Sequence, residues 1–257
     1  MNELTGKKAL VVGASRGLGR GIAEAFSAAG ATVVAVARDG PRLAELARSG
    51  PGMVAEVADA TDPAVAETLL ERHQPDVLAL VAGAAPLQGR LQDHTWETFS
   101  ANWNTDVRIG FHWLRKVLLL PLEPGSRVLV MSSGASLGSS PLSGGYAGAK
   151  ATLRFMADYA GQEAGRAGLD ISVTAVLPRL TSATDLGRPF VAAYAARAGI
   201  TEAQFLSQLG APVTPAVAGQ AFVQLATAEP ASMAPAYLLT GDGPEPLAGA
   251  GSKPSSS

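Results

Sequence analysis

The strongest constraint on the fold is a regular alternation of short apolar segments with longer helical ones. Seven segments rich in Val, Leu, Ile and Ala have the length of strands: residues 8–12, 32–37, 53–57, 77–81, 127–131, 171–176 and 236–239. Several are continuous apolar runs, which is typical of parallel strands buried on both faces. Strands that alternate with helices form βαβ units. The sequence therefore predicts an α/β fold, a doubly wound parallel sheet of about seven strands with helices on both faces.

One domain is expected over residues 1–240, because no linker divides the 257-residue chain and repeated α/β units commonly build one domain of this size. Residues 241–257 are rich in Gly, Pro and Ser, which predicts a flexible tail. A long helix is expected from about Trp96 to Leu119, with one apolar stripe that packs in the core or between subunits.

Composition excludes several classes of function. The net charge is −2 and no run of Lys or Arg forms a stripe, which argues against a nucleic-acid partner. Without cysteine, and with three histidines that lack metal-site spacing, no metal centre is expected. The apolar runs are shorter than a membrane span, and residues 1–8 lack the features of a signal peptide. A soluble, cytoplasmic protein without a membrane partner is expected.

A glycine-rich turn directly follows the first strand and opens a helix. Its sequence is Gly13-Ala14-Ser15-Arg16-Gly17-Leu18-Gly19. Glycine allows a tight backbone turn, and the free N–H groups at a helix N-terminus favour phosphate oxygens. The turn therefore indicates a binding site for the pyrophosphate of a dinucleotide.

A second motif combines a serine, a tyrosine and a lysine. Tyr146 and Lys150 are four residues apart, so they lie on one face of a helix. A phenol is a poor acid or base near neutral pH, but a neighbouring ammonium stabilises its anion. Ser133 ends the fifth strand, at the sheet edge where open α/β folds bind ligands, and its hydroxyl can hydrogen-bond the same carbonyl oxygen as Tyr146.

In this order, the two motifs resemble those of the short-chain dehydrogenase/reductase family, which carries TGxxxGxG at the glycine turn. The resemblance covers about residues 6–240 and implies a Rossmann fold. The chain departs from the family pattern in three places: Val12 replaces the usual threonine, Leu80 and Val81 replace two asparagines, and Arg179 replaces a glycine. The departures bear on the reaction more than on the fold.

NADP(H) is the expected cofactor. A carboxylate at the end of the second strand would bind a free ribose and repel a 2′-phosphate, but this chain has Ala37 and then Arg38. Arg16 and Arg38 could converge on one phosphate. In the competing interpretation, Arg38 is a surface charge and Asp39 binds the ribose of NAD(H).

The resemblance implies further cofactor contacts. Asp59 matches the position that holds the adenine, although it could equally be a loop acid or a helix cap. Thr181 and Thr184 are alternatives for the threonine that contacts the nicotinamide carboxamide. The remaining contacts implied are Ala82, Gly83, Tyr146, Lys150 and Pro178.

The implied reaction is the reduction of a ketone by hydride transfer. Tyr146 would donate the proton, Lys150 would stabilise its phenolate and bind the ribose hydroxyls, and Ser133, rather than Ser132, would polarise the carbonyl. The family's fourth residue is an asparagine in the preceding long helix, which holds a water in a proton relay. Counting along that helix favours Asn104, with Asn102 as the alternative.

Residues 185–210 correspond to the family's mobile lid, and their aromatic and aliphatic side chains predict a largely apolar carbonyl or alcohol substrate. The resemblance also implies a homodimer or homotetramer. Two other functions stay open: a redox-neutral isomerase or epimerase, and a non-catalytic NADP(H)-binding protein.

Overall fold

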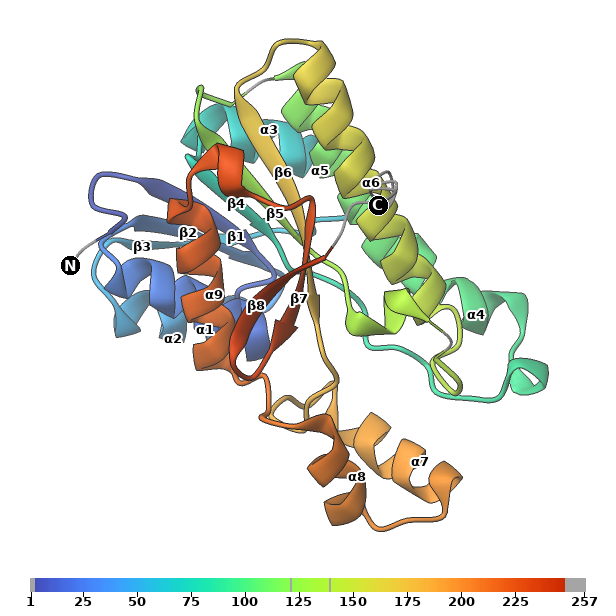
Figure 1. Cartoon of the computed structure of the whole chain (residues 1–257). Coiled ribbons are helices and arrows are strands. Elements are labelled where there is room, and N and C mark those ends of the chain that lie inside the picture. The colour runs from blue at the N-terminus through green and yellow to red at the C-terminus, as the bar shows by residue number, and fades with distance from the viewer. Residues whose placement is uncertain (1–2, 121, 139, 248–257) are drawn as a thin grey trace, which may run out of the picture.

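Eight strands form one sheet in the computed structural model, which describes residues 3–120, 122–138 and 140–247 (Figure 1). Their order across the described sheet is β3-β2-β1-β4-β5-β6-β7-β8. The bounds are β1 Lys8–Val12, β2 Thr32–Ala37, β3 Met53–Val57, β4 Val77–Leu80, β5 Ser126–Met131, β6 Ile171–Pro178, β7 Ala236–Thr240 and β8 Gly243–Leu247. The first seven pair in parallel, which confirms the predicted doubly wound sheet.

Helices cover both faces of the sheet (Figure 1). On one face lie α1 (Gly17–Ala28), α2 (Gly40–Ser49) and α9 (Pro215–Thr227), which bury side chains such as Phe26, Leu43 and Phe222 in one core. On the other face lie α3 (Pro63–His73), α5 (Arg108–Leu119) and α6 (Tyr146–Arg166), with Leu70, Trp113 and Leu153 in a second core. Buried strands with apolar residues on both faces require this double cover.

Capping residues fix where several helices begin. Asp62 accepts a hydrogen bond from Ala64 N–H at 2.9 Å, and Pro63 occupies the first turn of α3. Thr214 caps α9 in the same way. Close packing of α1 on α9 depends on Gly21 and Gly219, because a Cβ on either would collide with the backbone of the other segment.

The predicted long helix is divided in the structure. It consists of α4 (Trp96–Asn102), a π-helical segment (Trp103–Val107) and α5. The expectation of one continuous α-helix is therefore wrong. The π segment contains wider turns, so it changes which residues face the sheet after Trp103.

The expectation of a flexible tail from residue 241 is wrong for Gly243–Leu247, which form β8 and pair antiparallel with β7. The rest of that predicted tail, 248–257, lies outside the described residues. Among the helices that the structure describes, none is long and apolar enough to cross a bilayer.

Candidate active site

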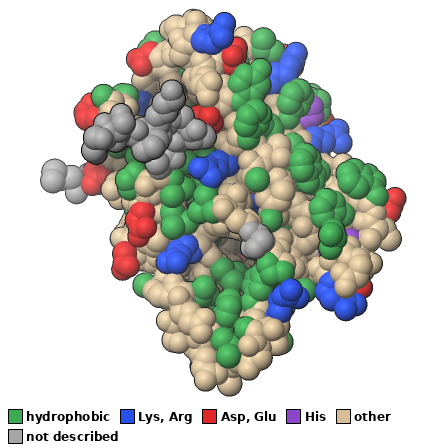
Figure 2. Space-filling model, turned by 45° about the vertical axis from the view of Figure 1, so that its right-hand side comes forward, with side chains coloured by type: hydrophobic (Ala, Val, Ile, Leu, Met, Phe, Trp, Pro, Cys, Tyr) green, Lys and Arg blue, Asp and Glu red, His purple; other side chains and the backbone are tan. Residues whose placement is uncertain are grey.

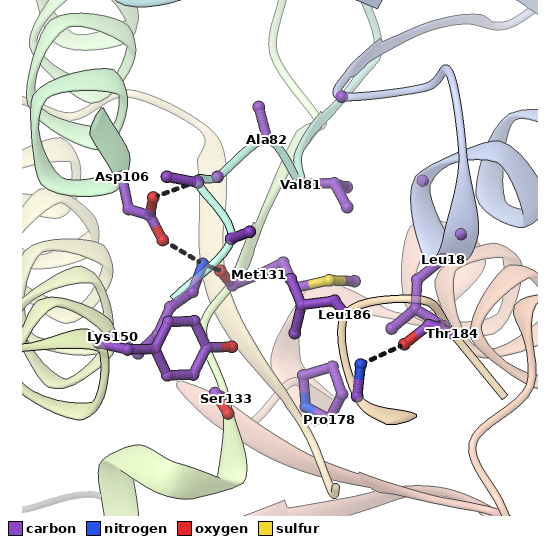
Figure 3. A pocket seen from close by; sticks show the side chains of 18 of the residues that line it. Leu18, Val81, Ala82, Asp106, Met131, Ser133, Lys150, Pro178, Thr184 and Leu186 are labelled. Atoms are coloured by element: carbon purple, nitrogen blue, oxygen red, sulfur yellow. Dashed lines mark hydrogen bonds and ion pairs between the residues drawn. The ribbon is translucent and has the colours of Figure 1, made fainter. Parts of the chain in front are cut away.

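The candidate site is a cavity of about 1180 Å³ at the carboxyl ends of the parallel strands. It lies beside the point where the strand order reverses, between β1 and β4. Open α/β sheets bind ligands at such a point because the flanking loops turn away from each other there. Figure 3 shows that side chains from distant segments converge on this cavity, among them Leu18, Ser133, Lys150 and Leu186.

The glycine turn forms one end of the cavity. Gly13, Ser15, Arg16, Gly17, Leu18 and Gly19 all line it. Gly13 has a φ of +100°, and a Cβ there would lie 2.6 Å from Ala82 N; a Cβ on Gly19 would collide with Gly13 O. The backbone is thus compact around the N-terminus of α1, which leaves its N–H groups facing the cavity. This cradle fits a pyrophosphate.

Two arginines beside this cradle have free guanidinium groups. Arg16 and Arg38 line the cavity, and neither side chain forms a hydrogen bond or ion pair with the described part of the chain. Asp39, the alternative ribose ligand, is already engaged: it accepts Arg42 N–H at 3.1 Å as the cap of α2, and its carboxylate lies 3.4 Å from Arg42 Nε. Arg16 and Arg38 are thus the two cations here whose side chains form no hydrogen bond or ion pair with the described residues.

Asp59 follows β3 and lines the same end of the cavity. Its Oδ1 accepts hydrogen bonds from Thr61 N–H at 3.0 Å and from the Thr61 hydroxyl at 2.8 Å. These two bonds lower the pKa of the Asp59 carboxyl, so it is ionised. The cap of the next helix is Asp62 rather than Asp59, and contact of Asp59 with adenine stays a prediction.

The segment after β4 forms part of the cavity wall. Val81, Ala82 and Gly83 line it, whereas Leu80 is buried in the core. Ala82 lies against Gly13, and Figure 3 shows both Val81 and Ala82 beside the cavity. The two asparagines missing from the family pattern are thus replaced by apolar side chains that pack.

Two adjacent serines at the end of β5 have different environments. Ser132 is buried, and its hydroxyl donates to Lys150 O at 2.7 Å, which ties β5 to α6. Ser133 is partly exposed, and its Oγ accepts Ala135 N–H at 3.2 Å. Figure 3 shows Ser133 at the wall of the cavity opposite Asp106. The geometry favours Ser133 as the group that faces a ligand.

The first turn of α6 contributes Tyr146 and Lys150 to the cavity. Lys150 is buried, and its Nζ lies 5.6 Å from the centre of the Tyr146 ring. Although burial alone would lower the pKa of Lys150, the carboxylate of Asp106 and the phenol of Tyr146 outweigh it and raise the pKa. Lys150 is therefore an ammonium at neutral pH, close enough to stabilise a phenolate.

Neither predicted asparagine lies beside Lys150. Asn104 is exposed, and its nearest polar partner is Ser100 Oγ at 3.4 Å. Asn102 is buried and donates to Ala84 O at 3.0 Å, so it binds the loop after β4. Neither residue lines the cavity.

Asp106 lies where an asparagine was expected. It belongs to the π segment, lines the cavity, and its Oδ2 is 3.1 Å from Lys150 Nζ. The sequence alone does not reveal Asp106, because a position counted along an uninterrupted α-helix does not allow for the wider turns of the π segment, and because the family pattern has an asparagine there.

The segment after β6 forms the opposite wall. Pro178, Thr181 and Thr184 all line the cavity. The Thr181 and Thr184 hydroxyls accept Ala183 N–H and Gly187 N–H, each at 3.1 Å, so both threonines order this segment. Thr184 lies close to Gly17 and therefore beside the glycine turn (Figure 3). Arg179 is exposed at the cavity wall.

Two short helices, α7 (Arg188–Ala198) and α8 (Glu202–Leu209), extend beyond the sheet in the segment for which the sequence predicts a lid (Figure 1). Tyr194 stacks on Phe205 with ring centres 6.1 Å apart, and it also packs on Phe190. All three aromatic residues line the cavity. The Tyr194 hydroxyl lies 2.7 Å from Ser140 Oγ, and this hydrogen bond joins α7 to the loop after Ser133.

No group of three or more metal-ligating side chains occurs within the described ranges.

Comparison with known proteins finds matches among reductases and dehydrogenases. A protein-family profile described as enoyl-(acyl carrier protein) reductase matches residues 13–238. A 7β-hydroxysteroid dehydrogenase of Collinsella aerofaciens is 29% identical over 192 residues, which is 70% of this chain and 72% of that protein.

Solved structures share the fold. A short-chain dehydrogenase from Burkholderia cenocepacia in complex with NADP superposes with a TM-score of 0.77 at 24% identity, over 93% of this chain and 98% of that one. A 3-ketoacyl-(acyl-carrier-protein) reductase from Brucella melitensis complexed with NADH gives 0.76 at 22% identity, with the same coverage. Among described elements, the mainly parallel sheet and its covering helices belong to this architecture.

Proposed function

Because the chain belongs to the short-chain dehydrogenase/reductase family, we propose that it is an NADPH-dependent reductase that converts a ketone to an alcohol. The observation that carries the proposal is the convergence of Ser133, Tyr146 and Lys150 on the cavity that also contains the glycine cradle. A dehydrogenase of a hydroxysteroid among its relatives supports chemistry between an alcohol and a ketone.

Each of the catalytic residues in the cavity has a different role in the proposed reaction. NADPH, when bound, would supply the hydride. Tyr146 donates a proton to the carbonyl oxygen, and Ser133 donates a hydrogen bond to the same oxygen. Lys150, held as an ammonium, stabilises the phenolate that Tyr146 leaves behind. Proximity of these groups to one carbonyl lowers the barrier because their positions are fixed before the reaction.

The choice of NADPH rests on the arginines of the cradle. Arg16 and Arg38 can bind the 2′-phosphate with paired N–H groups, and neither side chain forms a hydrogen bond or ion pair with the described residues. Arg38 also acts on Asp59 through its charge, which helps to lower the pKa of that carboxyl. Asp39 supports the choice as well, since its carboxylate already caps α2. Gly13, Ser15, Gly17, Leu18, Gly19, Asp59, Ala82, Gly83, Pro178 and Thr181 would contact the rest of the cofactor.

The substrate is a largely apolar ketone. The part of the cavity under the lid is lined by the aromatic group Phe190, Tyr194 and Phe205, together with Leu186 and Leu209. Leu186 is 42% exposed and projects into the cavity in Figure 3, so apolar surface there is available to a ligand. Burial of such a surface favours substrates with an aliphatic or aromatic body.

We further propose that the protein acts in the cytoplasm as a homodimer or homotetramer. The outer faces of α5 and α6 expose Phe111, Leu119, Phe155 and Tyr159, and Figure 2 shows hydrophobic side chains gathered on this side. A second copy of the same surface would cover them.

The experiment that tests the function is a titration of the purified protein with NADPH and with NADH. It is followed by absorbance of the nicotinamide during incubation with acetone, acetophenone, α-tetralone and menadione. The proposal expects tighter NADPH binding and oxidation that depends on a bulky ketone. Tight binding without consumption would favour a redox-neutral reaction, and no binding would exclude the proposed cofactor.

A further inference from the structure

Asp106 and Lys150 form an ion pair that is shielded from water. Asp106 Oδ2 lies 3.1 Å from Lys150 Nζ, and the side chains are 0% and 6% exposed. The second carboxylate oxygen, Oδ1, accepts Ala84 N–H at 2.7 Å. Apart from its contact with the Lys150 ammonium, Oδ2 has no hydrogen-bond partner within the described structure. Figure 3 shows the pair directly beside the cavity.

The surroundings of the pair are built around a carboxylate. A Cβ on Gly83 would lie 2.8 Å from Asp106 Oδ2, so glycine leaves the space that the carboxylate occupies. Asn102 and Asp106 together hold the loop after β4, since one donates to Ala84 O and the other accepts from Ala84 N–H. The π segment turns Asp106 toward the protein interior, where it is the buried residue of that segment.

We propose that Asp106 is a positioning residue that holds the Lys150 ammonium in place and keeps it charged beside Tyr146. A buried ammonium without a counter-charge loses its proton, because burial penalises the charged form. The charged or titratable groups that act on Lys150 are Asp106 from the π segment and Tyr146 from α6. From β5, Lys150 meets an uncharged acceptor, Met131 O at 3.4 Å. Asp106 is therefore the group that can supply the negative charge.

The direct ion pair between Asp106 and Lys150 differs from the arrangement that the family resemblance implies, in which an asparagine holds a water molecule in a proton relay. A neutral amide would leave the buried ammonium without a counter-charge and so make it easier to deprotonate, whereas the carboxylate stabilises the charge by direct contact. The role in turnover rests on the proposed function. The charge state of Lys150 does not, and it can be measured without substrate or cofactor.

The first test uses the unmodified protein, selectively labelled with ¹⁵N-lysine. The Nζ chemical shift reports whether each lysine is an ammonium or an amine, and the Lys150 signal is identified by its absence in Lys150→Arg. Because the pKa of Lys150 is raised, we expect Lys150 to remain an ammonium at pH values above 10.5, the ordinary pKa of lysine. Loss of the proton below that value would overturn the proposal.

The second test compares Asp106→Asn with the wild type. The amide keeps an acceptor for Ala84 N–H and nearly the same shape but removes the charge. We expect Lys150 to deprotonate about 1 to 3 pH units lower in the variant. Asp158→Asn, on the same helix but about two turns from Lys150 and with a partly exposed carboxylate, is the control and should leave the titration unchanged. Equal titration curves for Asp106→Asn and wild type would refute the role.

A third measurement links charge to catalysis. With NADPH and α-tetralone, kcat of Asp106→Asn should fall at least about tenfold over the pH range in which its Lys150 deprotonates, while KM changes little. The wild type should show no such fall over that range. A uniform loss at every pH, with the same profile as wild type, would indicate a merely structural role and contradict the proposal. If no protein variant oxidises NADPH, the reductase assignment fails, but the lysine titration still decides the ion pair.

Discussion

Tyr146 has the most demanding role of any single residue in the proposed site. It lines the cavity within 5.6 Å of Lys150 Nζ, measured from its ring centre. Replacing Tyr146 by Phe removes the acidic proton but keeps the ring. We expect kcat to fall by about 10² to 10⁴, since general acid catalysis contributes that much, while NADPH binding changes little. Stopped-flow kinetics and a binding titration measure both quantities.

Tyr159→Phe is the matched control, because Tyr159 lies on the same helix with its side chain exposed. It should retain wild-type turnover. If Tyr146→Phe turned over at the wild-type rate, another group would have to be the proton donor.

Arg38 decides the preference between the two nicotinamide cofactors. Its guanidinium is free at the cavity wall, and only NADPH has a phosphate for it to bind. We expect Arg38→Ala to weaken NADPH binding by about 10- to 100-fold, the value of one or two charge-assisted hydrogen bonds, and to leave NADH binding nearly unchanged. Fluorescence titration with both cofactors tests this, with Arg48→Ala as the surface control on α2. Equal losses for both cofactors would place Arg38 outside the phosphate site.

Some residues of the candidate site can be predicted from the sequence and others cannot. The motif residues Ser133, Tyr146 and Lys150 could be found because their types and spacing carry the chemistry, and the structure brings them to one cavity. Asp106 could not be found in this way. Its partner Lys150 is 44 positions away, and its orientation depends on a π segment for which helical periodicity gives no signal.

At the scale of elements, the seven parallel strands were predictable because each is a short apolar run between turn signals. β8 was not, because Gly243, Pro244 and Pro246 are typical of loops rather than strands. β8 forms only because β7 provides a partner, and pairing in the tertiary structure outweighs the local propensity of its residues. The sequence predicts the segment that contains the two short helices α7 and α8. It does not predict the hydrogen bond between Tyr194 and Ser140, because these residues are 54 positions apart.

The start of β1 is joined to the start of β4 by Asp76. Its carboxylate accepts Lys7 Nζ at 2.9 Å and Lys8 N–H at 2.8 Å. Partial burial would raise the pKa of Asp76, but these two bonds outweigh it and lower the pKa below the ordinary 3.8. A lowered pKa in the folded state stabilises the fold above the ordinary value, and this contribution is lost as the pH falls through the lowered one.

We therefore expect Asp76→Asn to reduce the free energy of unfolding by about 1 kcal/mol at pH 7. The difference from wild type should shrink below pH ~4 as the wild-type carboxyl gains its proton. Urea unfolding at several pH values measures it, with Asp158→Asn as the control. A difference that stayed constant down to pH ~2 would show that charge is not the cause.

For the whole molecule, the exposed apolar surface of α5 and α6 governs assembly. Phe155 is 65% exposed on α6, beside Tyr159 with ring centres 6.0 Å apart. We expect Phe155→Glu to shift the protein from an oligomer to a monomer, because the interface would have to bury two or more unpaired carboxylates. Sedimentation velocity measures the change, and Val54→Glu on the distant strand β3 should leave the mass unchanged. A wild type that is already monomeric would exclude this surface as a subunit interface.

The last strand also limits how molecules of this kind can join. Pro244 and Pro246 alternate along β8, and proline has no N–H. The single residue between them, Glu245, pairs with Leu238 of β7. Because backbone N–H groups point alternately toward and away from the partner strand, the missing proline donors belong to the outer border of the described sheet. A strand from another molecule would find acceptors there without matching donors. The border is therefore a poor template for strand addition, and the protein should resist fibril growth from that edge even when it is concentrated.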